Sequence, residues 1–262
     1  MRRGSDIPVL WHLKPSHFNE KARWALDYKA IEHRRVNPLP GAHMLLALAL
    51  TRRVVTLPVV RLDGKAIGDS TRIIAALEEY APEPPLYPDD PAERERALAL
   101  EEFFDSTLGP DVRCVGFSEF LRAREFVSEH AAEFTAPRQA FAVRSFVFPA
   151  FIRRRYGVSE EGAAKALVRI RATMGLIEDL LDGGDHLVGD RFTVADLTAA
   201  ALLAPLIAPP ELPYRRPDVS LPEGIQQITD DLRALPAGEW VLRTYETFRP
   251  ASAELAQEAV AV

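Results

Sequence analysis

The sequence contains a single cysteine, Cys114, among its 262 residues. One thiol excludes an intrachain disulfide and a zinc cluster built on cysteines, and it agrees with a reducing compartment. No apolar run approaches the ~20 residues that a transmembrane helix needs, and Met1 to Asp6 has no apolar stretch after its two arginines. We therefore expect a cytoplasmic protein that neither enters a membrane nor holds a metal.

An excess of positive charge is also lacking, because 32 Lys and Arg stand against 38 Asp and Glu, giving a net charge of -6. This balance argues against nucleic acid as the main partner, and Arg153–Arg155 is interpreted as a solvated helix end. The remaining composition, 47% hydrophobic and 27% charged, is that of an ordinary globular protein. A chain of this length can bury two cores, so two domains are plausible.

The most informative stretch begins at Pro58 and predicts two short paired strands. Val59–Leu62 and Lys65–Gly68 flank Asp63-Gly64, a dipeptide that suits a two-residue hairpin turn in which both residues need φ > 0. A proline at the start of a non-edge strand is tolerated mainly in a special role, often with a cis bond in a tight turn. We therefore expect a hairpin entered through an unusual proline.

A helix is predicted directly after this hairpin. Asp69 is a good N-cap, and the apolar residues that follow recur at helical spacing: Ile73, Ile74, Leu77 and Tyr80. A strand, a hairpin turn, a second strand and then a helix that begins at Asp69-Ser70 are typical of the end of a thioredoxin-like domain.

The preceding residues supply the rest of such a domain. Pro8–Leu13 and His33–Asn37 are predicted strands, with helices from near Ser16 and over Ala42–Leu50. Together with the hairpin and its helix, the order is β-α-β-α-β-β-α. Residues 1–80 are therefore predicted to form an α/β domain of the usual size.

A second domain is expected beyond a proline-rich linker. Residues 81–91 contain five prolines, too many for a helix or a central strand. From residue 92 to residue 262 helical patterns dominate, including Ala92–Phe104 and Gly162–Leu181, while the pattern over residues 135–157 predicts no definite structure. The C-terminal domain is thus predicted to be all-helical.

The best-specified helix start in this domain is at Thr193. Its side chain and that of Asp196 have the spacing of a capping box, in which each caps the other's backbone N–H. From Leu197 to Ile207 the sequence is apolar on every side, which predicts a helix buried at the centre of the domain.

Two signatures in this order resemble one known family. The first is Pro15–Leu26 (PSHFNEKARWAL) with Thr56-Leu57-Pro58 and Asp69-Ser70; the second is Leu187–Asp196 (LVGDRFTVAD). Together they look like a cytosolic glutathione S-transferase, of a serine-type and bacterial-like form, over roughly residues 7–235. The resemblance implies a thioredoxin-like glutathione-binding domain followed by a helical domain.

The resemblance also implies where glutathione binds. Leu57, before Pro58, would pair its backbone with the cysteinyl unit, and Asp69 with Ser70 would hold the γ-glutamyl end. A helix N-terminus favours a carboxylate, and an Asp nearby favours an ammonium; without the resemblance, Asp69 would be read as an N-cap only. Arg53, or its neighbour Arg52, would supply a charge for the glycine end.

Ser16 occupies the position that faces the thiol in the family's serine and cysteine types. Its hydroxyl would donate to the thiolate at the start of a helix, where the dipole lowers a thiol pKa; as an alternative, it caps the helix and nothing more. Asn19 is the expected second donor. Because Ser16 and Asn19 stand at the two positions that a CxxC motif would fill with cysteine, CxxC redox chemistry is excluded. Trp11 stands where the tyrosine type would carry its phenol.

The function expected from the resemblance is transfer of the glutathione thiolate to a hydrophobic electrophile, by a homodimer that needs no other cofactor. The alternative is a non-catalytic binding or adaptor protein that kept the fold. Ten of the thirteen phenylalanines lie within residues 103–151, which indicates either core packing or an apolar pocket for the electrophile. The identity of that electrophile, and the use of glutathione or another small thiol, stay open.

Overall fold

A computed structural model of the chain describes residues 6–38, 42–123, 147–214 and 221–256. The chain divides into two compact units. The first, here called the thioredoxin-like unit, comprises Met1–Leu86 and Phe248–Val262; the second, the helical unit, comprises Tyr87–Thr247. The sequence predicted one boundary, in the 81–91 linker, and placed everything after it in the helical domain. That second expectation was wrong for the residues from Phe248 onward.

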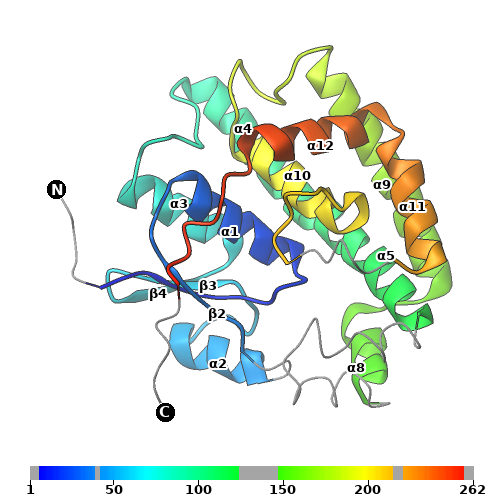
Figure 1. The fold of residues 1–262 in the computed structure, drawn as a ribbon, viewed down its shortest axis with the longest axis horizontal. Helices are drawn as coiled ribbons and strands as arrows, with labels where there is room; N and C mark the ends of the chain where they lie inside the picture. The colour runs from blue at the N-terminus through cyan, green and yellow to red at the C-terminus, as the bar shows by residue number, and fades with distance from the viewer. Residues whose placement is uncertain (1–5, 39–41, 124–146, 215–220, 257–262) are drawn as a thin grey trace. The chain divides into compact units, whose positions relative to one another are not determined.

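The thioredoxin-like unit is a four-stranded mixed sheet with helices on both faces (Figure 1). Its strands are β1 (Val9–Trp11), β2 (Arg34–Val36), β3 (Val59–Leu62) and β4 (Lys65–Gly68). They lie in the order β2-β1-β3-β4, with β1 parallel to β2 and the other neighbours antiparallel. Its helices are α1 (His17–Tyr28) between β1 and β2, α2 (Ala42–Thr51) between β2 and β3, and α3 (Ser70–Tyr80) after β4. The predicted β-α-β-α-β-β-α order is confirmed.

Val59 and Val60 of β3 are both buried, and because successive side chains of a strand point to opposite faces, β3 supplies apolar contacts to both faces of the sheet. Val59 belongs to a cluster with Ala47 of α2 and Leu57, while α3 buries Ile73, Ile74 and Leu77 on its apolar stripe. Helices α1 and α3 cover one face and α2 covers the other (Figure 1).

The hairpin turn between β3 and β4 has the predicted conformation. Asp63 and Gly64 have φ values of 46° and 76°, the left-handed values that a two-residue hairpin of this kind requires. The strand bounds Val59–Leu62 and Lys65–Gly68 are those expected from the sequence.

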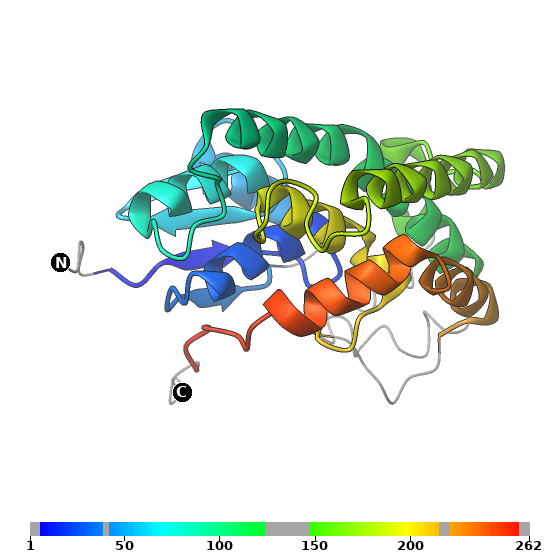
Figure 2. The same ribbon diagram turned by 90° about the horizontal axis from the view of Figure 1, so that it is seen from above.

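The helical unit is built around α10 (Val194–Ile207) (Figure 2). This helix packs against α4 (Pro91–Phe103), η1 (Phe104–Leu108), α5 (Gly109–Arg122) and α11 (Glu223–Arg233). Thr193 and Asp196 form the predicted capping box, and α10 is buried on all sides except at Pro205. Burial raises the pKa of Asp196 despite its three hydrogen bonds. The other described elements of this unit are α8 (Val147–Tyr156), α9 (Glu160–Leu181) and α12 (Pro236–Phe248).

Two features of this unit differ from, or add to, the expectation. The helix predicted over Ala92–Phe104 continues through one π-helical turn, η1, into α5 instead of ending. Within the stretch without a definite pattern, α8 forms a regular helix. Over the part of the chain that the structure describes, the helices are too short or too polar to cross a membrane.

Candidate functional site

The strand register gathers the three predicted site segments at one end of the sheet. Trp11, the last residue of β1, pairs with Val59 at the start of β3, and Val59 pairs with Gly68 at the end of β4. The residues that directly precede or follow these paired residues in the chain therefore lie at the same end of the sheet. They are the loop that leads to Ser16, the Leu57-Pro58 segment and the Asp69-Ser70 helix start.

Ser16 is the N-cap of α1 and accepts two hydrogen bonds from one residue. Asn19 donates to Ser16 Oγ from its side-chain Nδ2 at 2.6 Å and from its backbone N at 3.4 Å. A serine hydroxyl has two acceptor lone pairs and one donor hydrogen. Because both lone pairs face Asn19, the hydroxyl hydrogen is left to donate elsewhere.

Asn19 is fully buried, and its side chain links the Ser16 hydroxyl to two segments of backbone. Besides its bonds to Ser16, its Nδ2 donates to the carbonyl of Leu57 at 3.2 Å, and its Oδ1 accepts from the N–H of Leu13 at 3.1 Å. Both N–H groups of its side-chain amide are therefore engaged by acceptors within the protein. This geometry argues against the expectation that Asn19 is a second donor to sulfur.

The Leu57-Pro58 peptide bond is cis, as the proline's position suggested. Leu57 is buried in the cluster with Ala47 and Val59, and Trp11 packs against the same cluster. Trp11 therefore has a packing role, with the Arg61 guanidinium 5.8 Å from its ring centroid.

Asp69 caps α3 in a backbone conformation that side chains rarely adopt. Its φ is 80°, and its side chain accepts from the N–H of Arg72 at 3.2 Å. A non-glycine residue at positive φ costs of order 1 kcal/mol or more and is typical of functional sites. Ser70 next to it is buried as the first residue of the helix.

A close approach at Gly68 places the loop after α2 beside this helix start. A Cβ on Gly68 would lie 2.4 Å from Val54 Cγ2, so only glycine fits there. Arg52 and Arg53 precede Val54 in that loop and both are exposed. The structure gives neither guanidinium a contact with a described residue, so the choice between them stays a prediction.

Behind Ser16, Arg23 holds the loop that joins β1 to α1. Its guanidinium donates to the carbonyls of Leu13 and Lys14 at 3.2 Å and of Ser16 at 3.4 Å. Arg23 Nη1 is also 2.9 Å from His12 Nδ1. Burial, and next the charge of Arg23, lower the pKa of His12 to about 2; His12 is therefore a neutral acceptor.

Sequence reasoning did not single out Arg23 or its partner Glu20, although both lie in the quoted motif. Their spacing gave no signal, because at about 100° per residue Glu20 lies on the side of the helix opposite Ala22, where the pattern predicts exposure to solvent. Glu20 and Arg23 are each 1% exposed and form an ion pair of 2.8 Å.

The candidate features of the helical unit have a structural character. Cys114 is half-buried on α5, and burial raises the pKa of its thiol, which keeps it a poor nucleophile. Among the clustered phenylalanines, Phe104 is buried, and Phe117 and Phe120 pack against Leu121, Ile152 and Val158. The phenylalanines at 126, 134, 141 and 146 lie outside the described residues.

Comparison with protein families gives two matches in chain order. Residues 10–85 match the glutathione S-transferase N-terminal domain, and residues 160–223 match the glutathione S-transferase C-terminal domain. Together these matches span just over half of the chain. A probable maleylacetoacetate isomerase 1 of Drosophila melanogaster is 29% identical over 109 residues, which are 39% of this chain and 44% of that protein. The matched part is thus less than half the length of this relative.

Solved structures share the fold over nearly the whole chain. A tau class glutathione S-transferase from mango, Mangifera indica, is 16% identical with a TM-score of 0.59, covering 92% of this chain and 90% of that one. A glutathione S-transferase from Methylobacterium radiotolerans, solved in complex with glutathione sulfonate, is 24% identical with a TM-score of 0.50, covering 97% and 100%. At such identities the likeness concerns the fold.

Proposed function

The chain belongs to the glutathione S-transferase family, and on that premise we propose that it is a serine-type glutathione transferase in which the Ser16 hydroxyl stabilises the thiolate. The observation that carries this proposal is the pair of hydrogen bonds from Asn19 to Ser16 Oγ. With its acceptor positions used, the hydroxyl serves as a donor, and a thiolate is the strong acceptor that glutathione offers.

The end of the sheet where the three site segments lie also offers groups that could bind the remaining parts of glutathione. The Leu57 backbone, fixed through its carbonyl by Asn19, would pair with the cysteinyl unit beside Pro58. The start of α3 would hold the γ-glutamyl end, with helix N–H groups and Ser70 on its carboxylate and Asp69 on its ammonium. Arg53 would face the glycine carboxylate.

Chemistry then follows from the lowered thiol pKa. The α1 N-terminus and the Ser16 hydroxyl both favour the charged form of sulfur, and the thiolate is the nucleophile. The sulfur forms a bond to an electrophilic carbon of a hydrophobic co-substrate, and the leaving group departs with the bonding electrons. A cation such as a metal ion is not needed for this step, because the helix end and Ser16 stabilise the anion.

A second candidate reaction is favoured by the isomerase relative. The same thiolate can add to a conjugated double bond, allow rotation about the resulting single bond, and leave again. The net result is a cis–trans isomerisation that regenerates glutathione. It requires the same Ser16 site but no leaving group.

The test combines binding with turnover. Retention of the protein on immobilised glutathione is measured first, and turnover is then measured with an aryl halide, an epoxide and a cis-enone. We expect the unaltered protein to be retained and to turn over at least one of these probes. Retention without turnover of any probe would identify the non-catalytic binding alternative, and failure to be retained would overturn the proposal.

Ser16→Ala provides the residue-level test, with Ser106→Ala, an exposed serine of η1, as the matched control. Ser16→Ala should leave the glutathione affinity nearly intact and lower kcat by one to two orders of magnitude, or about 1.4–2.8 kcal/mol. It should also raise the pH midpoint at which bound thiolate absorbs in the ultraviolet. An unchanged midpoint and kcat would show that Ser16 only caps its helix.

A further inference from the structure

The segment that follows α12 packs against residues of the thioredoxin-like unit that come much earlier in the sequence. Trp24 Nε1 donates to the carbonyl of Phe248, 224 positions away, at 2.8 Å. Further on, the segment runs parallel to the start of β2, where the N–H of Leu255 donates to the carbonyl of His33 at 2.8 Å. Phe248–Ala256, here called the C-terminal segment, is thus part of the hydrogen bonding of this unit.

Arg249 is the residue of this segment that enters the buried charges of α1. Its Nε donates to Glu20 Oε1 at 2.7 Å, and its Nη1 is 2.9 Å from Asp27 Oδ2. All three side chains are at most 2% exposed, and the guanidinium also lies 5.8 Å from the ring centroid of Trp24. One guanidinium therefore bridges two carboxylates that are seven residues apart on the helix.

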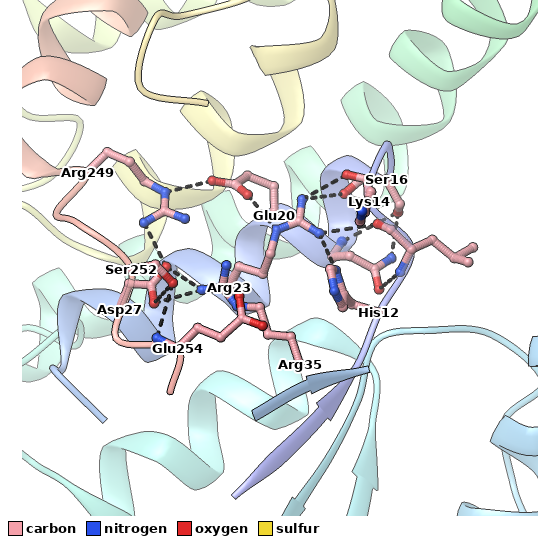
Figure 3. Close-up of polar contacts among 12 residues, drawn as sticks. His12, Lys14, Ser16, Glu20, Arg23, Asp27, Arg35, Arg249, Ser252 and Glu254 are labelled. Carbon is pink, nitrogen blue, oxygen red and sulfur yellow. Dashed lines mark hydrogen bonds and ion pairs between the residues drawn. The ribbon is translucent and has the colours of Figure 1, made fainter. Parts of the chain in front are cut away.

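The bridge continues from Glu20 to the loop of Ser16, as Figure 3 shows. The second oxygen of Glu20, Oε2, accepts from Arg23 Nε at 2.8 Å. Arg23 in turn donates to the loop carbonyls, including that of Ser16. A continuous path of hydrogen bonds thus runs from Arg249 through Glu20 and Arg23 to the backbone that carries Ser16.

The path belongs to a larger set of ion pairs on α1 and β2 and in the C-terminal segment, in which the charges balance. Arg35 pairs with Asp27 at 2.6 Å and lies 3.8 Å from Glu254. The set then holds three buried guanidiniums, those of Arg23, Arg35 and Arg249, with the two buried carboxylates of Glu20 and Asp27 and the partly exposed carboxylate of Glu254, whose side chain is 29% exposed. Removing one partner of a buried ionic set leaves an uncompensated charge, which costs far more than the loss of a surface pair.

Loss of the Arg249 charge has two consequences at Ser16. Glu20 loses the donor to its Oε1, and Arg23, the remaining cation in contact with it, is drawn toward both carboxylate oxygens and away from the loop carbonyls. The uncompensated negative charge also opposes the formation of a second anion nearby. Both effects raise the pKa of a thiol bound at Ser16.

We propose that Arg249 is a positioning residue for the thiol site, acting from the C-terminal segment through Glu20 and Arg23 to fix the backbone of Ser16. This inference rests on the proposed role of Ser16 toward the thiolate. Through this path, the C-terminal segment contributes to glutathione activation without contacting the tripeptide.

The experiment measures the thiolate midpoint of bound glutathione by ultraviolet absorbance against pH, with kcat and KM for glutathione and an aryl halide. Arg249→Met should raise the midpoint by about one pH unit and lower kcat about tenfold, with KM for glutathione changed less than about twofold. Arg171→Met, which removes an exposed pair with Asp231 in the helical unit, is the matched control and should leave all three quantities unchanged.

Glu20→Gln tests the path itself. It should loosen the Ser16 loop and lower kcat as Arg249→Met does, but it should raise the thiolate midpoint less, because the positive charge left by the loss of the Glu20 carboxylate favours the thiolate. The double variant should lower kcat no further than Arg249→Met alone, because both substitutions remove the same link. Effects that multiply in the double variant would overturn the proposed path.

If Arg249→Met does not fold, Arg249→Lys tests the proposed role of Arg249 in its place. Lysine keeps the positive charge but offers a point donor in place of the planar fork, so an intermediate midpoint and kcat are expected. Folded Arg249 variants with the midpoint and kcat of the unaltered protein would overturn this inference and leave the proposed function standing. Absence of glutathione binding by the unaltered protein would overturn both.

Discussion

Acid should destabilise the thioredoxin-like unit through His12. This histidine is 1% exposed, and its Nδ1 faces the Arg23 guanidinium at 2.9 Å, so it must be neutral in the folded protein. Burial and the Arg23 charge lower its pKa from 6.5 to about 2. Lowering the pH from 7 to 4.5 is therefore the perturbation to apply.

The sign and size follow from proton binding. Below pH 6.5 the unfolded chain binds a proton at His12 that the folded chain does not, so the stabilisation is complete above pH 6.5 and is lost progressively as the pH falls toward 2. The slope of the free energy of unfolding approaches about 1.4 kcal/mol per pH unit once His12 of the unfolded chain is fully protonated. Because that histidine is only half protonated at pH 6.5, the loss between pH 6.5 and 4.5 is about 2 kcal/mol. His33, whose pKa burial also lowers, adds to this loss in the same direction.

Urea unfolding at several pH values, followed by circular dichroism, measures the effect. In His12→Asn the amide oxygen takes the place of Nδ1, so the acceptor for Arg23 is kept and the titration is removed. The variant should lose stability on acidification less steeply than the unaltered protein, by about 1.4 kcal/mol per pH unit. Because carboxylates titrate alike in both proteins, the difference belongs to His12. Equal slopes in the two proteins would refute the neutral, buried histidine.

Three further predictions concern the site and the assembly. Ser70→Ala removes a hydrogen bond to the charged γ-glutamyl end, so glutathione affinity should fall by ~1.5–3 kcal/mol in calorimetry, and equal dissociation constants would remove Ser70 from the site. Asn19→Ala leaves the Leu13 N–H and the Leu57 carbonyl without their buried partner, so urea unfolding should show a loss of about 2–4 kcal/mol. The thiolate midpoint should rise in the same variant; a protein of unchanged stability and midpoint would contradict the role given to Asn19. The chain should form a two-fold dimer, and light scattering that shows 29.2 kDa at all concentrations would rule this out.

The parts of the fold that the sequence predicted well are those fixed by local signals. Asp63-Gly64 requires left-handed backbone and has it, and Thr193 with Asp196 forms the capping box that their spacing indicates. Asp69 caps its helix as expected, although nothing in the sequence indicates its φ of 80°. Local signals succeed because the interacting groups are within four residues of each other.

The parts that were missed depend on residues far apart in the chain. Arg249 meets Glu20 across 229 positions, so no spacing rule connects them. Asn19 was given the role of a donor to sulfur because its type and position fit, whereas its actual partners, Leu13 and Leu57, become its neighbours only once β1 and β3 pair. Roles within a buried polar network are set by the tertiary structure, which a residue pattern does not contain.

The return of the chain to its first unit has a consequence for its synthesis. Residues up to Leu86 leave the ribosome first, but Arg249 follows only after Tyr87–Thr247 have been made. At ~5–20 residues per second, that interval is about 10–30 s. During it, the nascent α1 holds Glu20 and Asp27 without the arginine that bridges them. The thioredoxin-like unit is therefore expected to complete its folding only after the helical unit has been made, although most of its own sequence precedes that unit.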